Sequence, residues 1–140
     1  MILQCSFEEL NALRDGAHVI LKSGLAGTSA VAAPPESQAL VGALVHQLGG
    51  SLSIQTLAKQ RAIEGAVNAI VEQLRATMES RILAQNPGDE AAVTSYFEFG
   101  HALSVHGRLR VMGAEMAALI ELATGRPPDE ETASTFIIPD

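Results

Sequence analysis

The strongest constraint on the fold is a pair of long helical segments joined by a very short turn. Large apolar residues between 55 and 84 recur at intervals of three and four, the period of an amphipathic helix; they are Ile63, Val67, Ile70, Val71, Leu74, Met78 and Ile82. The letters NPGD at 86–89 then interrupt the pattern. A second helical pattern covers 90–124 and ends at Gly125 and Pro127. The sequence therefore predicts a long antiparallel helix hairpin, over 55–84 and 90–124.

Two shorter helices are predicted before the hairpin. Ser6 and Glu9 have the spacing of a capping box, which predicts a helix over 7–22. Pro35 can open a second helix, over 35–48, which stops before a pair of glycines. Between these helices, residues 25–35 combine small residues, glycines and prolines without a helical period, so we expect a mobile connection there. The fold class predicted for the chain is an all-α helical bundle.

The remaining segments are short. Residues 51–56, SLSIQT, alternate in polarity and are either a short strand or the lead-in to the next helix. Residues 125–140 form a C-terminal tail with an acidic turn and an apolar end, FIIPD. We expect this end to dock on its own protein, within the chain or across a dimer, with strand pairing to residues 1–5 as one possible form; a hook for another protein is the alternative. The sequence indicates a single helical domain, 1–140.

Composition and charge narrow the classes of partner. The chain has 140 residues, 47% of them hydrophobic, which is sufficient for a buried core. Sixteen acidic and nine basic residues leave a net charge of −7, so the protein is expected to repel nucleic acid and anionic membrane surfaces. No apolar run reaches the roughly 18 residues of a membrane span. Cys5 is the only cysteine and the N-terminal segment does not resemble a signal peptide, so we expect a soluble, cytoplasmic protein.

Small residues form a stripe on each of the two long segments. On the second segment the stripe consists of Gly100, Ser104, Gly107, Val111, Ala114 and Ala118. On the first it consists of Ala58, Ala62, Gly65, Ala69, Glu72 and Ala76. A glycine inside a helix costs about 1 kcal/mol relative to alanine, so we expect a packing reason for the glycines.

The two stripes are in register if the hairpin folds about Pro87 and Gly88. This register predicts a close helix-packing seam made by Ala62, Gly65, Ala69, Gly100, Gly107 and Ala114. The alternative is that the alanines face water, where their helix propensity is sufficient reason for their presence.

A seam of small residues would leave the large apolar stripes to be covered by something else. A helix of about 30 residues is about 45 Å long, more than the two short helices can cover. We therefore predict a homodimer in which two hairpins complete a four-helix bundle. The candidate interface residues are Ile70, Leu74, Met112 and Met116.

The segment EFGHALSVHGRLR, residues 98–110, is the one candidate for a chemical site. Glu98 and His101 have the Glu-x-x-His spacing with which helical bundles present ligands to di-iron or di-manganese centres. A full site would need a second pair from another chain. The alternative is that Glu98, His101 and Arg108 make hydrogen bonds or ion pairs. A phosphoryl-acceptor role for His101 is disfavoured, because the lysine and glycine typical of phosphotransfer modules do not follow it.

The sequence contains no recognisable catalytic motif. This weakly favours a non-enzymatic helical interaction or regulatory module that acts as a homo-oligomer, with a protein partner as a further expectation. The competing hypothesis is a metal-dependent bundle that uses Glu98 and His101 across a dimer. No cofactor is favoured, although that hypothesis would require a divalent metal.

Overall fold

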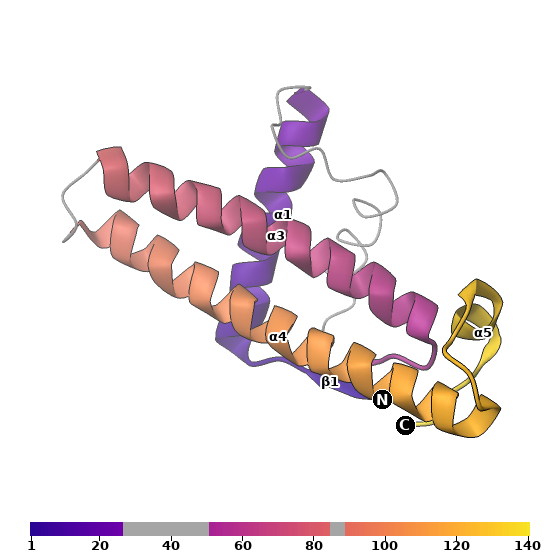
Figure 1. Ribbon diagram of the computed structural model, residues 1–140. Coiled ribbons are helices and arrows are strands. Elements are labelled where there is room, and N and C mark those ends of the chain that lie inside the picture. The colour runs from indigo at the N-terminus through magenta and orange to yellow at the C-terminus, as the bar shows by residue number, and fades with distance from the viewer. Residues whose placement is uncertain (27–50, 85–88) are drawn as a thin grey trace.

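The computed structural model describes residues 1–26, 51–84 and 89–140. The helix expected over 35–48, most of the connection expected over 25–35, and turn residues 86–88 lie outside the described residues. Figure 1 shows the arrangement of the described elements.

The predicted hairpin is confirmed. Helix α3, Leu57–Ala84, and helix α4, Glu90–Thr124, lie side by side and run antiparallel (Figure 1). The Asp89 side chain accepts a hydrogen bond from the Ala91 backbone N–H at the start of α4. At its end, Gly125 takes the left-handed conformation, with φ 76°, and its N–H donates to the Glu121 carbonyl oxygen. Both ends of α4 are therefore where local sequence signals predict them.

Helix α1, Phe7–Ala26, crosses the hairpin steeply and packs against both of its helices (Figure 1). Its start is the predicted capping box: the Ser6 N–H donates to Glu9 Oε1 at 2.8 Å, and the Glu9 N–H donates to Ser6 Oγ at 3.2 Å. The helix continues past the predicted end at residue 22, because a glycine weakens a helix without necessarily ending it.

The two ends of the described chain meet beside a small sheet. Strand β1, Ile2–Gln4, pairs antiparallel with strand β2, Ser51–Ser53, so SLSIQT does begin as a strand. The short helix α5, Glu130–Thr135, follows α4. The minor sheet thus includes N-terminal residues, but their strand partner is β2 and not the C-terminal segment.

The C-terminal segment docks on its own chain, as expected. The Ile138 N–H donates to the Gln55 carbonyl oxygen at 2.8 Å, and the Ile138 side chain is buried in the core. The Asp140 carboxylate accepts hydrogen bonds from the Met1 amine at 3.0 Å and from the Ser53 hydroxyl at 2.6 Å. These contacts place the segment next to both strands.

The core lies between the three long helices and contains the large side chains predicted to form an oligomer interface. Ile70, Leu74, Met112 and Met116 are all buried within the chain. They are therefore unavailable for contact with a second copy in this fold. Helix α1 contributes to this burial, because its Gly16 lies against Ile70 and Leu74, whereas Met112 lies beside strand β1.

The predicted seam of small residues is not found between α3 and α4. A methyl group added at Gly65, Gly100 or Gly107 would meet no atom within 4 Å, and Ala114 is exposed. Ala62 and Ala69 are half-buried. The helices turn their larger apolar side chains toward each other because burial of a Leu, Ile or Met side chain contributes about 1.5 to 3 kcal/mol, more than burial of the small residues.

Close approach involves two other glycines. A Cβ at Gly16 of α1 would lie 2.5 Å from Cγ2 of Ile70 on α3. A Cβ at Gly113 of α4 would lie 2.7 Å from the carboxamide nitrogen of Gln60, a buried side chain that donates to the Leu109 carbonyl oxygen. Helix contacts in the core therefore depend on Gly16 and Gly113.

Candidate functional site

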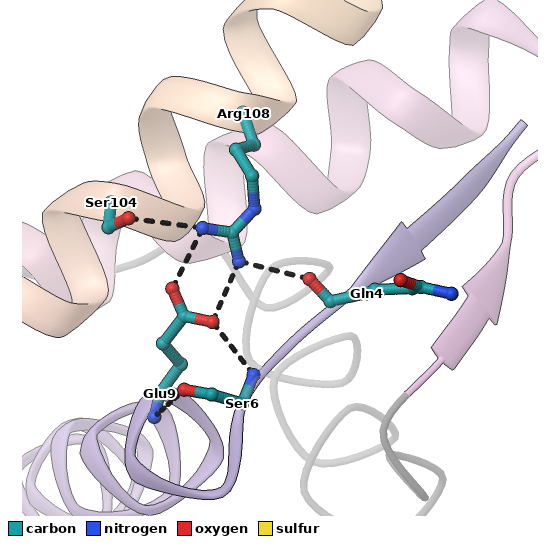
Figure 2. Close-up of polar contacts among 5 residues, drawn as sticks. All are labelled: Gln4, Ser6, Glu9, Ser104 and Arg108. Atoms are coloured by element: carbon teal, nitrogen blue, oxygen red, sulfur yellow. Dashed lines mark hydrogen bonds and ion pairs between the residues drawn. The ribbon is translucent and has the colours of Figure 1, made fainter.

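A network of polar side chains joins α4, the start of α1 and β1 (Figure 2). The Arg108 guanidinium donates to both carboxylate oxygens of Glu9, at 2.8 Å each. The same guanidinium donates to Ser104 Oγ and to the Gln4 carbonyl oxygen, at 3.0 Å each. Glu9 in turn belongs to the capping box with Ser6, so Arg108 connects α4 to the first turn of α1 and to the adjacent strand.

This network changes the acidity of its members. Hydrogen bonds from Arg108 lower the pKa of Glu9 from its ordinary value of 4.5 to about 2. The same pairing raises the pKa of Arg108. Burial raises the pKa of the neighbouring Cys5 thiol, and the charge of Arg108 offsets only part of this rise. A protonated thiol is a weak nucleophile, and the guanidinium already has its counter-ion, so the network is suited to holding elements together.

A second group of polar side chains lines a small cavity between α1, α3 and α4. The cavity has a volume of about 210 Å³ and is lined by Asp15, Val19, Leu74, Thr77, Arg81, Ser95 and Glu98. Arg81 donates to Ser95 Oγ and to the Ala91 carbonyl oxygen. Burial, and then the charge of Asp15, raise the pKa of Glu98. Glu98 thus faces a partly enclosed site of mixed charge.

The two members of the predicted metal pair differ in their surroundings. Glu98 lines this cavity, whereas His101, which is half-buried, is not among its lining residues. Within residues 1–26, 51–84 and 89–140, no group of three or more His, Cys, Asp or Glu side chains is placed to hold a metal ion. The sequence suggested ion pairs for Glu98, His101 and Arg108. The structure shows an ion pair between Arg108 and Glu9. A metal site completed by another chain stays a prediction.

The side of α4 that carries a row of exposed residues, and that borders strand β1 at Val111, is here called the outer face. It consists of Val93, Phe97, Gly100, Ser104, Gly107, Val111, Ala114 and Ala118, all of which are exposed. These positions follow alternating steps of four and three, the repeat of a coiled-coil seam. None of them is charged, over a length of about 40 Å.

Six of these eight residues form the small-residue stripe that the sequence predicts to pack on the other long helix, a contact that the structure does not contain. Val93 and Phe97 were not predicted, although both continue the same heptad spacing toward the start of α4. The two glycines of the outer face have no neighbour within the described chain that would explain them.

No family model, curated protein or solved structure matches this chain. None of the helices in the described part of the chain combines the length and the apolar character needed to cross a membrane.

Proposed function

We propose that this protein is a non-enzymatic interaction module that binds another protein chain through the outer face of α4. The observation that carries this proposal is the exposure of Gly100 and Gly107 in the middle of a long helix. Each costs about 1 kcal/mol of helix stability relative to alanine, and no contact inside the described chain offsets that cost. A helix packed closely against this face would do so, because glycine lets two backbones approach.

The composition of the surface also supports binding. Phe97 and Val111 lie on the outer face and Tyr96 beside it, and each of these side chains is more than half exposed. Large apolar side chains that are exposed close together on one helix face often mark an interaction site. The polar networks support a non-enzymatic role, because Arg108 is engaged by Glu9 and burial raises the pKa of the Cys5 thiol, which disfavours the reactive thiolate.

Site-specific photo-crosslinking in cells tests this proposal. The full-length chain would carry p-benzoylphenylalanine in place of Val111, or in place of the exposed residue Arg61 of α3 as a control. We expect a defined adduct from position 111 and not from position 61, with the crosslinked peptides identified by mass spectrometry. The adduct should disappear with Gly107→Leu and persist with Gly65→Leu. Identical adducts from both positions, or none from position 111, would contradict the proposal.

A further inference from the structure

We infer that the outer face of α4 binds a second copy of this chain, with the two α4 helices antiparallel about a two-fold axis level with Val105 and His106. This inference rests on the proposed function, and it goes further by naming the partner and the register. Three properties of the outer face support it: the sizes of the exposed side chains, their lack of charge, and the surface area available for contact.

Size complementarity selects the antiparallel arrangement. With the two-fold axis between residues 105 and 106, the numbers of any two facing residues add up to 211. Phe97 then faces the partner's Ala114, and Val111 faces the partner's Gly100. In the same register Val93 faces the partner's Ala118, and Ser104 faces the partner's Gly107. Every large apolar side chain then has a glycine or an alanine opposite it, and all eight positions are used. Such alternation of large and small residues allows close packing without voids or overlap.

Other registers match less well. In a parallel pair each residue would face the same residue of the other copy. The layer with two Phe97 side chains would be overcrowded, and the layer with two Gly100 residues would leave a void. An antiparallel pair shifted by one heptad toward the C-terminus would place Phe97 opposite the charged residue Glu121. A shift in the other direction would place Val93 opposite Val111 and leave Ala118 facing a position before the start of α4.

Charge is compatible with this contact. No charged side chain belongs to the outer face, so the pairing buries no unpaired charge there. Arg108, at the edge of the face, is already neutralised by Glu9 of its own chain. The net charge of −7 on each copy opposes association at long range, and added salt screens that repulsion. We therefore expect the dimer to strengthen with ionic strength.

The available area reaches the range of specific dimers. The outer face is flanked by Tyr96, 60% exposed, and Leu103, 42% exposed, and its own largest side chain, Phe97, is 58% exposed. These side chains and the small residues between them present roughly 600 Å² on each copy, or roughly 1,200 Å² for the pair, the lower limit of stable specific interfaces. An interface at this lower limit is typical of weak or transient association, so we expect the dimer to be reversible.

Disulfide trapping tests the partner and the register together. In a Cys5→Ser background, chains that carry Val111→Cys would be mixed with chains that carry Gly100→Cys. The proposed register places these two cysteines opposite each other, so the mixture should form a covalent dimer under mild oxidation. Each variant alone should not, since its two copies would hold their cysteines about 16 Å apart along the axis. Crosslinking of either variant with itself, and not in the mixture, would overturn the register.

Sedimentation equilibrium through the micromolar range gives an independent test. The unmodified protein should dimerise, and Gly107→Leu should weaken the dimer by at least about tenfold without loss of helicity, because its new side chain points away from the core. Gly65→Leu is the matched control, since Gly65 is also an exposed helical glycine with open space around it but lies on α3. A monomer at all concentrations, or equal effects of the two changes, would overturn the inference.

The photo-crosslinking at position 111 separates the two levels of proposal. An adduct that contains a second copy of this chain supports both. An adduct with a different protein would contradict the proposed dimer but would still support the proposal that α4 binds another protein chain. An adduct within one chain, for example to residues 27–50, or no adduct at all, overturns both.

Discussion

Arg108 of α4 holds both carboxylate oxygens of Glu9 at the start of α1, each at 2.8 Å, although 99 residues separate the two. Glu9 is almost fully buried, whereas the Arg108 side chain is 42% exposed. The pair therefore connects the start of α1 to α4 at the edge of the core. It also makes the stability of the folded protein depend on pH in the acid range.

Glu9→Gln should lower stability at neutral pH and flatten its dependence on pH. The folded-state pKa of Glu9, about 2, lies below its ordinary value of 4.5, so the unfolded chain takes up the proton first as pH falls. The contribution of the pair is thus complete above about pH 5 and is lost toward pH 2. We expect a loss of about 2 kcal/mol at pH 7, less than the full pKa difference implies, because Arg108 is solvated. Urea unfolding at several pH values measures this.

Glu8→Gln is the control for that experiment, because Glu8 is the exposed neighbour of Glu9. It should leave the slope of stability against pH between 2 and 5 nearly unchanged. Equal slopes for Glu9→Gln and the unmodified protein would show that the pairing with Arg108 does not persist in solution.

Gly16→Ala should destabilise the fold, whereas Gly65→Ala should stabilise it. The new methyl group at Gly16 would collide with the buried side chain of Ile70, at a cost of about 1 to 3 kcal/mol. The methyl group at Gly65 would meet no atom and would improve helix propensity by up to about 1 kcal/mol. Thermal unfolding of both variants measures the two effects; a change of the same sign for both would contradict the close contact between Gly16 and Ile70.

Glu98→Gln should stabilise the protein near neutral pH but not in mild acid. The raised pKa of Glu98 means that the folded state holds its proton to higher pH than the unfolded chain does. The charged form therefore costs stability as pH rises through that window, and glutamine avoids this cost. Melting temperatures at pH 4 and pH 7 measure the difference. Glu115→Gln, at an exposed position, serves as the control, and a gain that is the same at both pH values would argue against a partly buried carboxyl at position 98.

Ile138→Ala and Ile137→Ala should differ sharply although they are adjacent. Ile138 is 6% exposed and lies in the core cluster, whereas Ile137 is 58% exposed. We expect a loss of about 2 kcal/mol from the first change and a change within about 0.5 kcal/mol from the second. Chemical denaturation of the two variants measures both values. Losses of similar size would indicate that the C-terminal segment does not dock as described.

Local signals were sufficient to predict the elements of the hairpin and the caps of α1 and α4. They were not sufficient to predict which side of α4 would be buried. Apolar residues occur nearly all round this helix, so its periodicity offers two faces that could enter the core. The cost of helical glycines and the register of the two stripes predicted that the small residues of α4 would face α3, whereas the structure leaves Gly100, Gly107 and Ala114 exposed.

The bounds of the hairpin helices can be predicted from local sequence, because apolar periodicity, capping side chains and helix-breaking residues act over only a few neighbouring positions. What each helix faces depends on how the helices pack together. The burial of Ile70, the contact at Gly16 and the pairing of Arg108 with Glu9 all depend on α1 crossing the hairpin. That crossing brings together residues that are far apart in the chain. It is stabilised by the total apolar area that the three helices bury together, which cannot be calculated from any one segment of the sequence.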